Sequence, residues 1–210
     1  MKHFTLHFNI LAAATVSLWA ATALPAHAED DPHAHHHHHE MAMTEPGVKV
    51  STASYPVVAV ALVKADGKHT DLARELSDKR PVVLNFIYTT CTAICPVQTH
   101  TLAEAQRQLG ADASKIHLMS ISIDPENDTP AKLREYARQY GAGTNWDFYT
   151  GTAESSIAAQ KSFEAFRGDK MNHEGLTLMR ASPGKPWVRL DGLAKPDQIV
   201  AEFRKLSAAN

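Results

Sequence analysis

The chain has 210 residues, and its 23 Asp and Glu nearly balance its 21 Lys and Arg, for a formal net charge of −2 at pH 7. This balance provides no electrostatic footprint for nucleic acid or for an anionic membrane surface. The two cysteines exclude a scaffold held together by several disulfides. The length suits one domain with a full hydrophobic core.

Residues 1–28 have the pattern of a secretory signal peptide. Lys2 gives a weakly basic start, an apolar stretch runs from Ile10 to Ala23, and Ala26-His27-Ala28 fits a small-residue cleavage site. An uncleaved membrane anchor is the alternative, but the apolar stretch is shorter than the about 20 residues that span a bilayer. We therefore expect export to the periplasm, where disulfides are permitted, and membrane contact only if the leader is retained.

Residues 29–50 are predicted to be a disordered tail, because they contain little that could form a core. Imidazole and thioether groups at this density favour copper, nickel or zinc. A purification tag is the alternative explanation for any polyhistidine, although a run between a leader and a domain is not the usual place for one. The auxiliary metal ligands predicted in the tail are His33, His35, His36, His37, His38, His39, Met41 and Met43.

Strand and helix patterns alternate through residues 51–210, which indicates one α/β domain. Apolar runs predict strands at 57–63, 82–88, 116–123 and 146–149, and a hairpin at 176–180 and 187–190. Helices are predicted from about 70 to 77 and at 92–109, 130–141, 154–166 and 196–206. A cysteine-bearing βαβ unit followed by a hairpin and a helix is the order of a thioredoxin-like fold, with a central, mostly parallel sheet flanked by helices.

Cys91 and Cys95 lie where a buried strand is predicted to pass into a helix. Their spacing places both on one face of a helical first turn. A cysteine at a helix N-terminus has a lowered pKa, because the dipole and the free N–H groups stabilise the thiolate. A structural disulfide or a pair of buried thiols is the alternative. The carboxyl end of a parallel strand is, however, where α/β folds bind ligands, which favours a chemical role.

Two thiolates leave a metal site incomplete, and the predicted domain offers four histidines as a third ligand. His69 lies in a polar turn, and His100 points about 140° away from the second cysteine around its helix. His117 lies inside a strand, where packing is the expected role. His173 lies in a loop before the predicted hairpin. A loop histidine is usually solvated, so the pattern alone does not single out His173.

The runs Tyr88-Thr-Thr-Cys91-Thr-Ala-Ile-Cys95-Pro96 and Ser122-Ile-Asp124-Pro125-Glu-Asn-Asp128-Thr129-Pro130, with the distant His173, resemble the Sco/SenC family of copper-binding proteins. The resemblance extends from about residue 57 to 206. It implies a thioredoxin-like fold that binds copper, as Cu(I) or Cu(II), through Cys91, Cys95 and His173. It also implies a chaperone that delivers copper to a cuproenzyme, typically the CuA centre of cytochrome c oxidase, with a copper donor or a thiol reductant as further partners.

The sequence departs from the family pattern at three points. Thr92 stands where many members have proline, which should leave the cysteine turn less rigid. Asn172 precedes His173 where aspartate is common, so the hydrogen-bond partner of the imidazole is expected to differ. Many relatives keep a membrane anchor, whereas this leader has a cleavage site.

Several further side chains have two interpretations. Asp124 is a candidate for orienting the metal ligands, but an Asp-Pro turn whose carboxylate bonds local backbone is equally consistent with the sequence. Asp128 and Thr129 are assigned to helix capping, with Pro130 at the first helical position. Met171 and Met179 are candidate soft contacts for copper, although packing is the preferred role for both.

Two enzymatic functions compete with the metallochaperone. A thiol–disulfide oxidoreductase would use Cys91 as nucleophile and Cys95 as resolving thiol, but redox members of the thioredoxin class usually separate these cysteines by two residues. A peroxiredoxin-like peroxidase would need a separate resolving cysteine. Zinc is the chemical rival of copper, but structural zinc sites usually have four ligands. A copper chaperone that is not an enzyme is therefore the preferred function, with loading controlled by oxidation of the two thiols.

Overall fold

The computed structural model describes residues 47–56 and 58–208, which belong to one compact unit, Thr44–Asn210. The predicted leader and all of the predicted tail ligands lie outside the described residues. In the described part of the chain, no helix has the length and apolar character needed to cross a membrane.

A mixed sheet forms the centre of the unit, and its described strands follow the order β1-β8-β7-β4-β5-β6-β2-β3. The strands are β1 (Lys49–Ala53), β2 (Ala61–Lys64), β3 (His69–Asp71), β4 (Val82–Ile87), β5 (His117–Ser122), β6 (Trp146–Thr150), β7 (Leu176–Arg180) and β8 (Trp187–Asp191). The helices are α1 (Leu72–Glu75), α2 (Ile94–Leu109), α3 (Pro130–Gln139), α4 (Ala153–Ser162) and α5 (Pro196–Ala208), with 3-10 turns η1 (Gly110–Lys115) and η2 (Lys170–Asn172).

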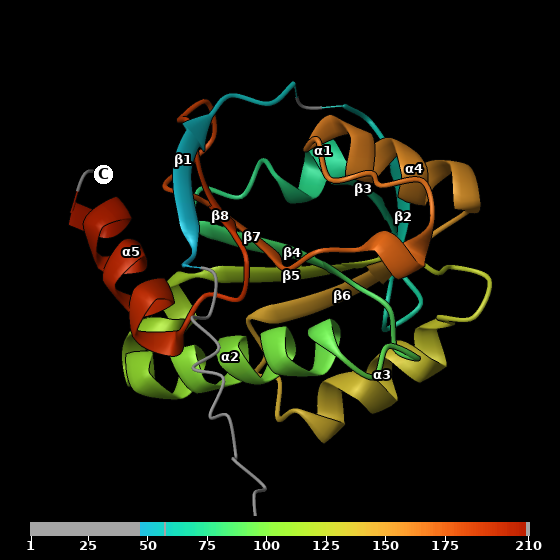
Figure 1. Cartoon of the computed structure of the whole chain (residues 1–210), viewed down its shortest axis with the longest axis horizontal. Helices are drawn as coiled ribbons and strands as arrows, with labels where there is room; N and C mark the ends of the chain where they lie inside the picture. The colour runs from blue at the N-terminus through green and yellow to red at the C-terminus, as the bar shows by residue number, and fades with distance from the viewer. Residues whose placement is uncertain (1–46, 57, 209–210) are drawn as a thin grey trace, which may run out of the picture. The chain divides into compact units, whose positions relative to one another are not determined.

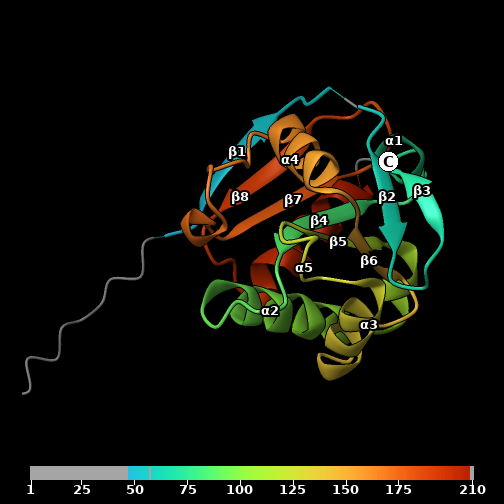
Figure 2. The ribbon, with the colours of Figure 1, turned by 90° about the vertical axis from the view of Figure 1, so that its right-hand side faces the viewer.

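Helices cover both faces of the sheet (Figures 1 and 2). The α1 and α4 helices lie on one face, and α2, α3 and α5 lie on the other. Strand β4 contributes Val82, Leu84 and Phe86 to the core beneath α1 and α4, and Val83 and Ile87 to the opposite core. Burial on both faces explains why this strand is an almost continuous apolar run.

The α/β prediction is confirmed, and parallel pairing is confined to the centre of the sheet. Strands β4, β5 and β6 are parallel, whereas the other described pairings are antiparallel. The pairing of β7 with β4 sets Thr177 opposite Asn85, so β7 begins at the edge of the sheet where β4 ends. The segment before β7 is thereby brought to the segment after β4.

Two edge strands, β1 and β3, do not appear among the predicted elements. Strand β1 has the sequence KVSTA and is largely exposed, and β3 has only three residues, HTD. Neither shows the alternation of apolar and polar residues that predicts a strand. Strand β1 begins at Lys49, inside the range that the sequence analysis assigned to the tail.

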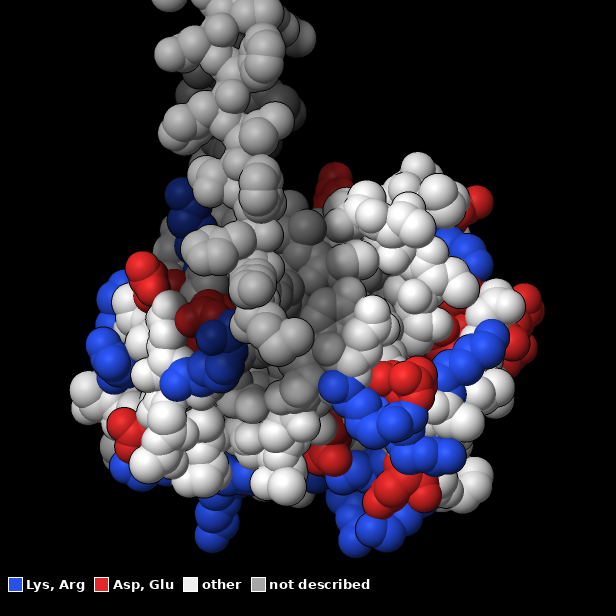
Figure 3. All heavy atoms as spheres, turned by 90° about the horizontal axis from the view of Figure 1, so that it is seen from below, with Lys and Arg blue, Asp and Glu red and all other residues white. Residues whose placement is uncertain are grey.

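The described surface carries both signs of charge in proximity. On the face shown in Figure 3, Lys and Arg side chains lie beside Asp and Glu side chains. This mixture agrees with the small net charge of the chain.

Candidate metal site

The two cysteines lie at the start of α2 as free thiols. Cys91 precedes the helix and is partly exposed, whereas Cys95 lies in the first helical turn and is fully buried. The backbone N–H of Cys95 donates to Cys91 Sγ at 3.5 Å. The spacing of the cysteines therefore brings the first sulfur onto a free N–H group of the helix N-terminus, as the sequence predicted.

The two thiols differ in their pKa values. Burial acts to raise the pKa of Cys91, but the N–H groups of Cys95 and Ala93 and the Tyr88 hydroxyl stabilise its thiolate, so its pKa is lowered. Burial raises the pKa of Cys95 to about 12. Burial likewise raises the pKa of Tyr88 to about 12, so its hydroxyl remains a donor. The Cys91 thiol therefore ionises more readily than an ordinary thiol, whereas the Cys95 thiol stays protonated at neutral pH.

Asp128 anchors the loop that leads to Cys91, a role that the sequence analysis missed. Its fully buried carboxylate accepts the Thr89 backbone N–H at 3.2 Å and the Thr89 hydroxyl at 2.5 Å. It also accepts the Ser122 hydroxyl at 2.6 Å. Assigning Asp128 to helix capping was therefore wrong, whereas Thr129 does cap α3 through the N–H of Lys132. No local pattern reveals a contact across 39 residues of sequence.

His173 is buried in front of β7, beside the end of β4. Its Nε2 lies 3.0 Å from the carbonyl oxygen of Phe86. A carbonyl only accepts, so Nε2 carries the proton and Nδ1 retains the lone pair that can bind a metal. Burial lowers the pKa of His173, which keeps the imidazole neutral. The chain thus provides an imidazole in the protonation state that a metal requires.

The loop that carries His173 is held on both sides. Before it, Lys170 Nζ contacts Asp124 Oδ2 at 2.7 Å. After it, the carbonyl of Gly175 accepts the Gly192 N–H at 2.7 Å, and a Cβ at position 175 would lie 2.9 Å from the Gly192 oxygen. Glycine is required at position 175 because any side chain there would collide with the backbone of Gly192.

Asp124 combines a turn with a tertiary contact. Besides Lys170, its carboxylate accepts the Asn127 side-chain amide at 3.0 and 3.1 Å. The local turn and the link to the His173 loop therefore coexist. A cavity of about 320 Å³ beside the loop is lined by residues that include Asp124, Lys170 and His173.

Cys91, Cys95 and His173 do not form a closed trio of ligand atoms. Within the described residues, the group of three His, Cys, Asp or Glu ligand atoms found within 4.8 Å of one another is Glu75, His117 and Asp147. The topology brings the three predicted ligands to the end of the sheet where β4 ends and β7 begins.

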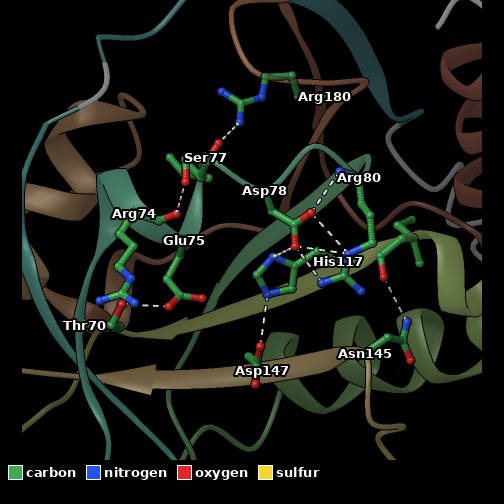
Figure 4. Close-up of polar contacts among 12 residues, drawn as sticks. Thr70, Arg74, Glu75, Ser77, Asp78, Arg80, His117, Asn145, Asp147 and Arg180 are labelled. Carbon is green, nitrogen blue, oxygen red and sulfur yellow. Dashed lines mark hydrogen bonds and ion pairs between the residues drawn. The ribbon is translucent and has the colours of Figure 1, made fainter.

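The Glu75, His117 and Asp147 group lies near the amino ends of the parallel strands β5 and β6 (Figure 4). The two cysteines follow the carboxyl end of β4, so they lie at the other end of these strands. His117 Nε2 lies 3.1 Å from Asp147 Oδ2, and Lys64 Nζ lies 2.9 Å from the same oxygen. Lys64 also lies 3.7 Å from Glu75, whose carboxylate accepts the Tyr149 hydroxyl. An ammonium group already compensates these carboxylates, so we interpret the group as structural.

The other predicted candidates separate clearly. His69 and His100 are exposed, and His117 is buried in β5, as expected for a packing residue. Met179 is fully buried in the core beside α2, whereas Met171 is exposed and its sulfur lies 3.8 Å from the Tyr88 hydroxyl. The packing role preferred for Met171 is therefore wrong.

A thioredoxin-like protein with two thiols at a helix N-terminus is the class that this fold and site define. The chain belongs to the SCO1/SenC family, whose family model matches residues 59–208. It is 32% identical over 165 residues to the SCO1 protein homolog of Bacillus subtilis (strain 168), covering 73% of this chain and 84% of the relative.

Two solved structures extend the comparison. The structure of BsSco, a member of the Sco family of cytochrome c oxidase assembly proteins in which a disulfide switch was identified, is 28% identical with a TM-score of 0.63, covering 76% of this chain and 98% of that one. Copper-bound ScoI of Bradyrhizobium japonicum is 23% identical with a TM-score of 0.60, covering 71% and 98%, and supports the fold. Copper is thus the metal that the comparisons support for this family, as the sequence predicted.

Proposed function

We propose that this protein is an exported copper chaperone that binds copper through Cys91, Cys95 and His173. The observation that carries the proposal is the topology: β4 leads into the turn that carries the two thiols, and its antiparallel partner β7 begins just after the buried His173. Two thiolates and an imidazole are a donor set that accepts both Cu(I) and Cu(II). The expected recipient is a cuproenzyme such as the CuA centre of cytochrome c oxidase, and the leader pattern supports a periplasmic location.

The unequal thiols suit a site that loads and releases its cargo. Cys91 provides a stabilised thiolate for first contact, whereas Cys95 must lose its proton to a base or to water before it binds. Oxidation of the pair to a disulfide gives two electrons and two protons to an oxidant and removes both sulfur ligands. Copper loading is therefore coupled to the thiol redox state.

The same thiols support a second candidate function, a thiol–disulfide oxidoreductase. Cys91 would attack the substrate disulfide as a thiolate, and Cys95 would resolve the mixed disulfide. The partly exposed, activated first thiol and the buried second thiol favour this possibility. The buried imidazole of His173 has no role in that reaction. We therefore prefer the copper chaperone, which uses this imidazole, to the oxidoreductase.

Copper titration of the reduced protein, with insulin disulfide reduction measured in parallel, tests the two functions. We expect Cu(II) to give a sulfur-to-copper charge-transfer band that Cys91→Ser and Cys95→Ser abolish. His173→Ala should weaken Cu(II) more than Cu(I), because thiolates alone still suit Cu(I). A band that persists in both serine variants would refute the site, and rapid insulin reduction without copper binding would favour the oxidoreductase.

The auxiliary role of the tail has a separate test. Deleting residues 29–43 should lower the copper stoichiometry of the full chain while leaving the charge-transfer band intact. An unchanged stoichiometry would contradict the collecting role assigned to His33, His35–His39, Met41 and Met43.

A further inference from the structure

Met171 presents an apolar side chain to solvent where the sequence favours packing. It is 73% exposed, the highest value among the large hydrophobic side chains that the structure describes as exposed. The other described methionines, Met119 and Met179, are completely buried in the two cores. Packing therefore does not account for a methionine at position 171.

The backbone around Met171 is nevertheless well anchored. Its N–H donates to the Asp169 carboxylate at 2.8 Å, and the neighbouring Lys170 is tied to Asp124. Two residues further on, His173 is held by the Phe86 carbonyl. The thioether thus projects from a positioned turn two residues before the proposed imidazole ligand.

The sulfur of Met171 lies beside the segment that leads to the first cysteine. The Tyr88 hydroxyl donates to Met171 Sδ at 3.8 Å, and the Tyr88 carbonyl accepts the N–H of Cys91 at 3.2 Å. A thioether sulfur has two lone pairs, so one remains for a soft cation while the hydroxyl occupies the other.

We propose that the Met171 thioether is an additional ligand for Cu(I), used while copper enters or leaves the cysteine site. This inference rests on the proposed function and specifies how the cargo is exchanged. Thioethers select Cu(I) over harder ions, and they bind without losing a proton. The exchange is a substitution of ligands in which the copper stays Cu(I), so no oxidant or reductant is required.

The test follows the methyl groups of the methionines by NMR in the full chain, labelled with 13C-methyl methionine and kept reduced. Met171→Leu assigns the Met171 signal, and the buried Met179 provides an internal reference. Adding up to one equivalent of Cu(I) should shift the Met171 signal and leave the Met179 signal in place. The double variant Cys91→Ser/Cys95→Ser should remove this shift, because only the tail would then hold copper.

A competition with a Cu(I) chelator supplies the second measurement. Met171→Leu keeps the apolar volume and removes the sulfur, so we expect about three- to tenfold weaker retention of Cu(I). Val97→Leu changes another exposed apolar side chain and should retain Cu(I) as the unaltered protein does.

The outcomes separate the two proposals. A Met171 signal that stays unshifted while thiolate–Cu(I) absorption develops would overturn the thioether ligand and leave the chaperone function standing. A shift that survives in the double serine variant would also overturn it. Absence of any Cu(I) binding that depends on the cysteines would overturn both proposals.

Discussion

The carboxylate of Asp128 holds Thr89 by both its backbone N–H and its hydroxyl. Thr89 lies two residues before Cys91, so the position of the first thiol depends on a side chain from the loop between β5 and α3. The contact couples the loop before α3 to the loop before α2.

Asp128→Asn is expected to destabilise the protein by about 1–3 kcal/mol. The amide NH₂ of asparagine cannot accept a hydrogen bond, so one of the buried donors on Thr89 or Ser122 loses its acceptor. Urea denaturation measures the change. The control is Glu126→Gln, an exposed neighbour, which should stay within about 0.5 kcal/mol of the unaltered protein. Equal stability of the two variants would contradict the anchoring role.

The depressed pKa of His173 predicts a pH-dependent stability. The folded chain holds this imidazole neutral, whereas the unfolded chain protonates it near the ordinary value of 6.5. Between the folded pKa and 6.5 the unfolded state binds more protons, so stability rises with pH across that window. Denaturation of the reduced protein from acidic to neutral pH should therefore give a steeper slope than the same series on His173→Gln. Parallel slopes would argue against a neutral, buried imidazole.

The unequal thiols predict selective alkylation. In the Cys95→Ser variant, iodoacetamide should modify Cys91, and the alkylation rate should rise at a lower pH than it does for an ordinary thiol. The reason is that hydrogen bonds lower the pKa of Cys91. Cys95 in Cys91→Ser should react slowly at neutral pH, since burial raises its pKa and restricts access. Mass spectrometry of the modified peptides measures both rates. Faster modification of Cys95 would reverse the assignment of first contact.

Two histidine substitutions test whether the group of Glu75, His117 and Asp147 stabilises the fold. His117→Leu removes the 3.1 Å contact with Asp147 and should cost about 1–3 kcal/mol of stability. His100 lies on the exposed face of α2, so His100→Leu should change stability by less than about 0.5 kcal/mol. Thermal or urea denaturation compares them. Copper binding should be the same in both, because neither histidine belongs to the proposed site.

Local sequence patterns were sufficient for the elements that carry the thiols. The apolar run of β4, the cysteines at the start of α2, and Thr129 with Pro130 at the start of α3 all follow from short-range rules. The polar edge strands β1 and β3 lack such a pattern, and their pairing depends on neighbours that are distant in sequence.

The parts of the site that escaped prediction are tertiary contacts. Asp128 lies in a D-T-P run typical of helix starts, and its actual partner Thr89 is 39 residues away. The bridge from Lys170 to Asp124 spans 46 residues and the contact of Tyr88 with Met171 spans 83. Only the folded chain reveals which side chains meet across such separations.

Gly175 has no side chain to contribute to any reaction, yet the placement of the imidazole depends on it. A methyl group at position 175 would meet the Gly192 carbonyl. The start of β7 would then have to move away, and His173 would move with it. A survey of random variants should therefore recover changes at Gly175 among those that fold but fail to retain Cu(II). Such a result would identify backbone clearance, and not only donor chemistry, as a requirement for holding the metal.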